Sequence, residues 1–116
     1  MINIYTDTGE HAKGLAVLRD SGLIKIITAD TLGDDKEATP LFSAIQNIVG
    51  PSNLQDARHV DTACREACAA FITSDIDDIL SKKWKLEELT QMRFFHRVLD
   101  WQEFVAWLDS KKLSPP

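Results

Sequence analysis

The chain has 116 residues, an ordinary apolar content of 44% and a formal net charge of -5. This length fits one domain over residues 1–116 with a single core, and the negative charge argues against a protein that binds nucleic acid mainly through its overall field. No run approaches the ~20 apolar residues of a membrane span, and the N-terminus lacks the basic and apolar regions of a secretory signal. We therefore expect a cytoplasmic protein that does not enter a membrane.

The first half of the chain alternates strand and helix patterns. The second helical pattern contains Pro40, which is tolerated only in the first turn or two, so the true start of this helix is expected near Thr39. The predicted elements are strand 2–6, helix 10–20, strand 23–28, an acidic loop over 29–35 and helix 36–49.

The second half continues the alternation. Ser52 and Gln55 form a capping-box pattern, and so do Asp100 and Glu103, so each pair is expected to open a helix. Alternation of strands and helices predicts an α/β fold with a mainly parallel sheet. The predicted elements are helix 52–68, strand 69–73, short helix 76–82, helix 84–92, strand 94–99 and helix 100–111.

Three aspartates occupy equivalent places in this pattern. Asp7 ends the first strand, Asp56 lies in the first turn of a crossover helix, and Asp75 follows the third strand. Because parallel strands end, and crossover helices begin, at the same edge of a sheet, these carboxylates should gather there. Such a group repels itself unless a cation such as Mg²⁺ holds it. A bound ion of this kind polarises a phosphodiester oxygen and lowers the pKa of a water, which gives a nucleophile near neutral pH.

Each acid also has a local explanation. Asp56 could only stabilise its helix N-terminus, by about 0.3–1 kcal/mol, and Asp75 could only cap the short helix that follows, by about 1 kcal/mol. Asp77 and Asp78 suit a solvated first turn, whereas Asp7 after an apolar strand is harder to explain locally.

Several stretches resemble the PIN-domain family. The helix that begins Asp56-Ala57-Arg58-His59 leads into a strand ending Thr73-Ser74-Asp75, and the opening strand ends Thr6-Asp7-Thr8. The stretch 97–104 resembles the last strand and helix of that family. The resemblance implies a three-layer α/β/α sandwich with a mainly parallel central sheet. It also implies a Mg²⁺- or Mn²⁺-dependent ribonuclease, often the toxin of a bacterial toxin–antitoxin pair, with RNA as substrate and an antitoxin as protein partner.

Carried over residue by residue, the resemblance makes Asp7, Asp56 and Asp75 the catalytic and metal-binding acids. Glu37 is the best match for the family's fourth acid, with Asp34 as a rival. The stretch between Glu37 and Asp56 is shorter than the pair of helices usual in the family, which keeps open a non-catalytic PIN-like module that binds a partner protein. The family commonly has an alanine where this chain has Asp61, which either brings an extra acid onto the helix or is a surface feature.

Other polar and aromatic residues have two interpretations each. Basic residues beside aromatic ones can bind phosphates and stack bases, although such lysines more often form a solvated face and such aromatics a core. His59 shares a helix face with Asp56 and either orients that carboxylate or is a surface or packed histidine. Cys64 and Cys68 suit small buried apolar positions. The basic and aromatic clusters are Lys82, Lys83, Trp84 and Lys85, and Arg93 to Arg97 with Phe94 and Phe95; a last stripe of Trp101, Phe104, Trp107 and Leu108 predicts core or a homodimer surface.

Overall fold

The computed structural model describes residues 2–7, 22–28, 38–97 and 99–113. The predicted helix 10–20, the acidic loop and the residues Asp34 and Glu37 lie outside these ranges. Among the described helices, none combines the length and the apolar character that crossing a bilayer requires.

A four-stranded, fully parallel sheet forms the centre of the molecule, with the strand order β2-β1-β3-β4. The interior strands β1 and β3 are apolar and buried on both faces, as is usual in parallel sheets that carry helices on each side. This confirms the predicted α/β class. The strands are β1 Ile2–Thr6, β2 Ile24–Ile27, β3 Ala70–Thr73 and β4 Arg93–His96.

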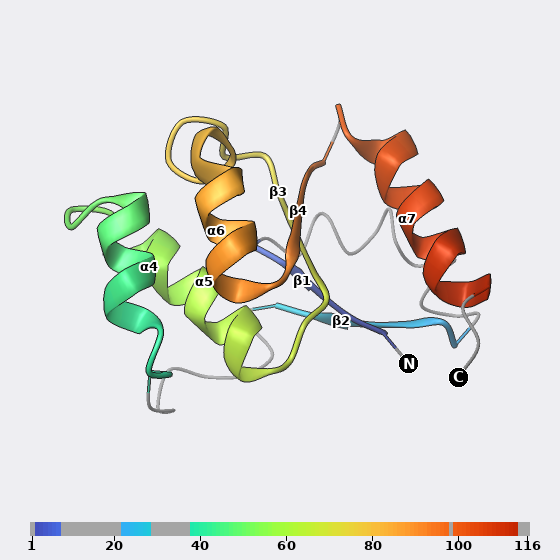
Figure 1. Ribbon diagram of the computed structural model, residues 1–116, viewed down its shortest axis with the longest axis horizontal. Helices are drawn as coiled ribbons and strands as arrows, with labels where there is room; N and C mark the ends of the chain where they lie inside the picture. Colours follow the sequence, from blue (N-terminus) through green and yellow to red (C-terminus); the bar gives the residue numbers. More distant parts are fainter. Residues whose placement is uncertain (1, 8–21, 29–37, 98, 114–116) are drawn as a thin grey trace.

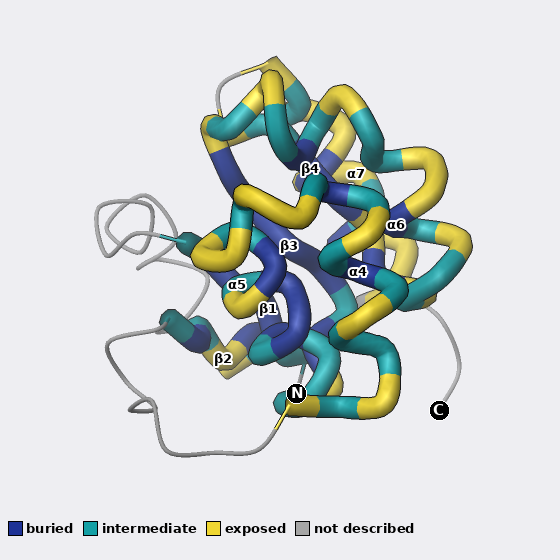
Figure 2. The backbone as a smooth tube through the Cα atoms, turned by 90° about the vertical axis from the view of Figure 1, so that its left-hand side faces the viewer, coloured by how far each residue is buried: buried dark blue, intermediate teal, exposed yellow. Residues whose placement is uncertain are grey.

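Helices cover both faces of the sheet and make a three-layer sandwich (Figure 1). On one face, the rings of Tyr5, Phe71 and Phe94 stack in a row with centroid distances of 5.1 Å, beneath α4, α5 and α6. On the other face, Phe95 packs edge-on against Phe104 of α7 at 5.3 Å. Figure 2 shows the buried strands enclosed by these helices. The helices are α4 Phe42–Val49, α5 Leu54–Arg65, α6 Lys83–Thr90 and α7 Trp101–Leu113.

The predicted capping box at the start of α5 is wrong. The residue before the helix is Asn53, and its side-chain amide donates to the carbonyl of Val49 at 2.6 Å instead of capping α5. Ser52 lies in the turn before it. Asn53 therefore ties the end of α4 to the start of α5.

Other element boundaries also differ from the predictions, and three of them have a clear structural cause. Helix α5 stops at Arg65 because Ala67 adopts a left-handed conformation (φ 55°) and the N–H of Cys68 bonds back to the carbonyl of Ala63. The predicted strand 94–99 ends at His96, where the carboxylate of Asp100 accepts the His96 N–H at 2.8 Å and turns the chain. The predicted helix 76–82 is reduced to a short 3₁₀ turn, η1 Leu80–Lys82, in which the N–H of Lys82 bonds to the carbonyl of Ile79. The N–H groups of residues 80 and 81 bond to carbonyls five residues earlier, which is not the pattern of an α-helix.

Candidate metal centre

The order of the strands reverses at β1. The chain passes from β1 to its neighbour β2 on one side and then crosses to β3 on the other side. In open parallel sheets, ligands bind outside the carboxyl ends of the strands at such a switch point. Asp7 directly follows β1, and Asp75 follows β3 by two residues, so both acids lie at this position.

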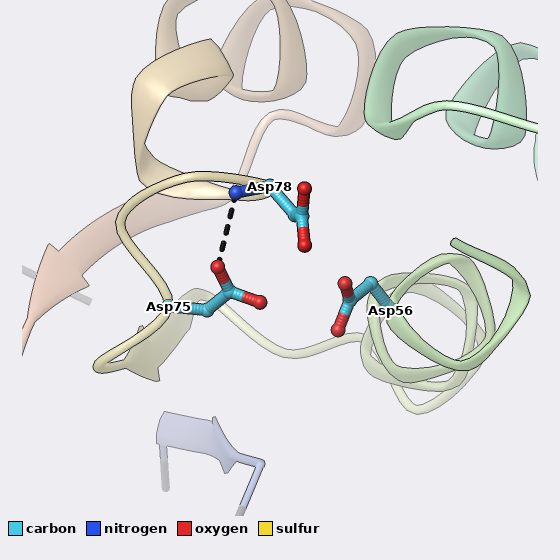
Figure 3. A group of neighbouring side chains, drawn as sticks. All are labelled: Asp56, Asp75 and Asp78. Carbon is cyan, nitrogen blue, oxygen red and sulfur yellow. Dashed lines mark hydrogen bonds between the residues drawn. The ribbon is translucent and has the colours of Figure 1, made fainter. Parts of the chain in front are cut away.

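Carboxylate oxygens of Asp56, Asp75 and Asp78 all lie within 4.8 Å of one another (Figure 3). Asp56 enters from the first turn of α5, and the other two come from the loop after β3. All three side chains are partly buried. Oxygens that share one Mg²⁺ at about 2.1 Å are at most about 4.2 Å apart, so the group would need to contract only slightly around an ion.

Asp75 is both a local cap and a member of the acidic group, the two roles considered from the sequence. Its Oδ1 accepts the backbone N–H of Asp78 at 3.0 Å, which is a local cap of the turn. The same bond brings Asp78 into the acidic group, and the second oxygen of the Asp75 carboxylate can still take part in other interactions. Local capping and membership of the group are therefore compatible.

Asp7 is held against β3 by a buried threonine. The hydroxyl of Thr73 donates to Asp7 Oδ2, and its oxygen accepts the backbone N–H of Asp75 at 3.0 Å. The negative charge of Asp7 also acts on Asp56. The structure thus places Asp7, Asp56 and Asp75 at one edge of the sheet, while Glu37 falls outside the described residues.

The acidic group changes the proton affinity of Asp56. Its pKa rises from an ordinary 3.8 to about 6, first through burial and then through the negative charges of Asp75, Asp78 and Asp7. A hydrogen bond to Asp75 adds to the shift, because it favours the protonated form of Asp56. A bound divalent cation would offset the repulsion between these carboxylates and so lower the pKa of Asp56.

Asp78 is the member of the group whose sequence position favoured a solvated first turn. The missed signal is its spacing: an aspartate side chain commonly accepts the N–H of a residue two or three positions later, which draws that residue close. Asp77, between the two, is exposed as expected, and its carbonyl accepts the hydroxyl of Ser81.

Asp61 belongs neither to the acidic group nor to the surface. It is only 3% exposed, and its two oxygens accept the N–H of Thr39 at 3.2 and 3.1 Å. Its Oδ1 also accepts the Thr39 hydroxyl. The Thr39 hydroxyl oxygen in turn accepts the N–H of Leu41. Asp61 therefore secures the entry to α4, which begins at Phe42 and not at Thr39.

His59 packs against the sheet. Its Nδ1 lies 2.6 Å from the hydroxyl of Tyr5, a β1 residue whose side chain is fully buried. The packed interpretation of this histidine is therefore the one that the structure supports. Cys64 and Cys68 are free thiols whose pKa values burial raises to about 11 and about 12, so they suit inert packing positions.

Two of the basic residues make contacts within the fold. Lys82 Nζ donates to the carbonyl of Val49 at the end of α4 at 3.1 Å, and Arg93 lies over the ring of Phe95 beside the carboxylate of Glu87. Arg97 is exposed after β4, and the Arg93 side chain is also 52% exposed despite its contacts. Both phenylalanines of β4 are core residues, as the alternative interpretation of this cluster expected.

Comparison of the chain with models of known protein families, with curated proteins and with solved structures gave no match. The resemblance to PIN domains consequently stays a prediction from the quoted motifs.

Proposed function

We propose that this protein is a metal-dependent ribonuclease of the PIN type, acting on RNA in the cytoplasm, in which Asp7, Asp56, Asp75 and Asp78 hold Mg²⁺ or Mn²⁺. The supporting observation is the convergence of carboxylates from separate segments at the switch point of the sheet. Helix caps and turns each need only a single acidic side chain. They give no reason for Asp56 to be placed where neighbouring acids raise its pKa to about 6.

The donor set fits a hard divalent cation. All the candidate ligand atoms are carboxylate oxygens, and Mg²⁺ typically uses one or two carboxylates together with waters and substrate phosphate. When bound, such an ion would polarise a phosphodiester oxygen and supply a nucleophilic water near neutral pH.

The chain's own residues would preorganise this site. Thr73 fixes the orientation of Asp7 and the backbone of Asp75, and the N–H of Asp78 fixes one oxygen of Asp75. Asp56 approaches from α5, whose start is tied to α4 through Asn53. Ligands held by such surrounding hydrogen bonds need little rearrangement when an ion or substrate arrives.

A second candidate is a non-catalytic PIN-like module that binds a partner protein such as an antitoxin or a second copy of the chain. Ile76 and Leu99 favour it, because they are 52% and 75% exposed in the loops that leave β3 and β4 at the same edge. Exposed apolar side chains can mark interaction sites. This candidate requires no metal, so metal binding separates the two.

The test is calorimetric titration of Mn²⁺ into metal-free protein, for the wild type, Asp56→Asn and Asp77→Asn. Asp77 is the matched control, because it is an exposed acid in the same turn as the group but outside it. Binding that is retained in Asp77→Asn and lost in Asp56→Asn supports the proposed site. RNA cleavage should likewise be retained in Asp77→Asn, be lost in Asp56→Asn and stop in EDTA. Cleavage by purified Asp56→Asn at the wild-type rate contradicts the proposal.

A further inference from the structure

Large apolar side chains that remain exposed gather near the acidic edge. Helices α5, α6 and α7 all begin on the side where β3 and β4 end (Figure 1). Within the described part of the chain, five of the exposed large apolar residues lie in the loops or first helical residues on this side, and Val105 lies one turn into α7. The five are Leu54, Ile76, Trp84, Leu99 and Trp101.

Trp84 stands out because of its neighbours. Its side chain is 77% exposed, more than any other large apolar side chain that the structure describes, although it is the second residue of α6. Leu86, two positions on, is fully buried, and residues two apart in a helix point in nearly opposite directions. The indole therefore projects away from the core.

The surroundings of this indole are positively charged. Lys83 and Lys85 flank it in sequence, and Lys82 is held nearby by its bond to Val49. The first turn of α6 contains no acidic residue, and a helix N-terminus adds partial positive charge. Of the acids further along α6, Glu87 is engaged by the N–H of Phe94 and by Arg93, and Glu88 remains exposed one turn beyond Trp84.

The basic patch formed by Lys82, Lys83 and Lys85 around Trp84 is close to the acidic group. Asp78 precedes Trp84 by six residues, so the chain limits their separation to about 20 Å. The bond from Lys82 to Val49 and the bond from Asn53 to the same carbonyl also join the start of α6 to the start of α5, which carries Asp56. A strand that contacts the patch can therefore extend to the acidic group.

We infer that Trp84 is a base-stacking contact for single-stranded RNA, with Lys83 and Lys85 binding its phosphates. An exposed aromatic ring among amines matches the alternation of flat bases and anionic phosphates, and a single strand exposes its bases where a duplex hides them. The inference rests on the proposed function in naming RNA as the strand, but the contact itself requires no metal.

The test is fluorescence anisotropy of a short labelled oligouridine in EDTA, which prevents metal-dependent cleavage. Trp84→Ala should raise the Kd about tenfold or more, and Trp84→Phe should restore most of the affinity because it keeps an aromatic ring. Leu99→Ala is the matched control, since Leu99 is equally exposed at the same edge but lacks flanking lysines. The double change Lys83→Ala and Lys85→Ala should weaken binding and reduce its salt dependence. Thermal unfolding checks that each variant is folded.

Three results overturn the inference: a wild type that does not bind the oligonucleotide, a Trp84→Ala variant with wild-type affinity, or a Trp84→Ala variant that changes only self-association in sedimentation. Asp56→Asn separates this inference from the nuclease proposal. If Asp56→Asn cleaves RNA like the wild type while Trp84→Ala still weakens binding, the nuclease proposal fails and the stacking contact stands. If metal binding and cleavage behave as proposed but Trp84→Ala binds normally, only the stacking contact fails.

Discussion

Thr73 donates its hydroxyl proton to Oδ2 of Asp7, a residue 66 positions earlier in the chain. The same hydroxyl oxygen accepts the N–H of Asp75, so one buried group sets the positions of two acids from different strands. Because both strands end at the switch point of the sheet, this hydroxyl acts as a support for the candidate metal centre.

Replacing Thr73 by valine keeps the shape of the side chain but removes both bonds. We expect the affinity for Mn²⁺ to fall about 10–100-fold, the usual effect of losing a group that orients metal ligands. The free energy of unfolding should fall by about 1–3 kcal/mol, because the Asp7 carboxylate loses a buried donor. Calorimetry and urea unfolding measure the two effects. Thr73→Ser retains the hydroxyl and should stay near the wild type, and equal losses in both variants would argue against this role.

Asp78 can be tested through its effect on Asp56. The negative charge of Asp78 is one of the causes that raise the pKa of Asp56 to about 6. Asp78→Asn should therefore lower the pKa of Asp56 and weaken Mn²⁺ binding, whereas Asp77→Asn should leave both nearly unchanged. Carboxyl carbon shifts followed by NMR across a pH series give the pKa directly. An Asp56 that titrates identically in Asp78→Asn and the wild type would show that the two side chains are not close.

The stability of the metal-free protein should depend on the charge of Asp56. A carboxyl whose pKa is raised on folding binds its proton more tightly in the folded chain than in the unfolded chain. The stability it contributes therefore falls as the pH rises from 3.8 to about 6, and the loss is complete above that range. Thermal unfolding of the wild type and Asp56→Asn in EDTA should show the variant gaining relative stability at neutral pH compared with acidic pH. Saturating Mn²⁺ should raise the unfolding temperature of the wild type at neutral pH and leave that of Asp56→Asn unchanged, because only the wild type binds it.

The α/β class and the position of the acids could be predicted from the sequence. The apolar runs of β1 and β3 identify buried parallel strands, and parallel strands place the residues that follow them at a common edge. Asp7, Asp56 and Asp75 follow from that rule without knowledge of any side-chain contact.

Details that depend on side-chain hydrogen bonds could not be predicted in the same way. Ser52 was predicted to cap α5, but Asn53 is the residue that precedes this helix. The Asn53 amide bonds to the Val49 carbonyl, which is a contact between two helices. Asp61 was expected as an extra acid on the helix or as a surface feature, since nothing local to α5 indicates that Thr39 supplies two donors to it. Patterns within one element predict that element, and contacts between elements decide which polar group is buried.

Asp61 gives a prediction about stability that is separate from function. Removing its carboxylate leaves the partly buried N–H and hydroxyl of Thr39 without their acceptor, which should cost about 2–3 kcal/mol. Asp61→Ala should therefore lower the urea midpoint by about 1–2 M, given a typical dependence on urea for a domain of this size. Mn²⁺ affinity should be unaffected in the folded variant, because Asp61 lies outside the acidic group.

A double-mutant cycle with Thr39→Ala assigns this loss to the pair. Thr39→Ala removes the hydroxyl donor, so combining it with Asp61→Ala should cost less than the sum of the single changes, by about 0.5–3 kcal/mol. Strict additivity would mean that the carboxylate stabilises the fold through other groups. A loss of Mn²⁺ binding in folded Asp61→Ala would instead connect this aspartate to the metal centre.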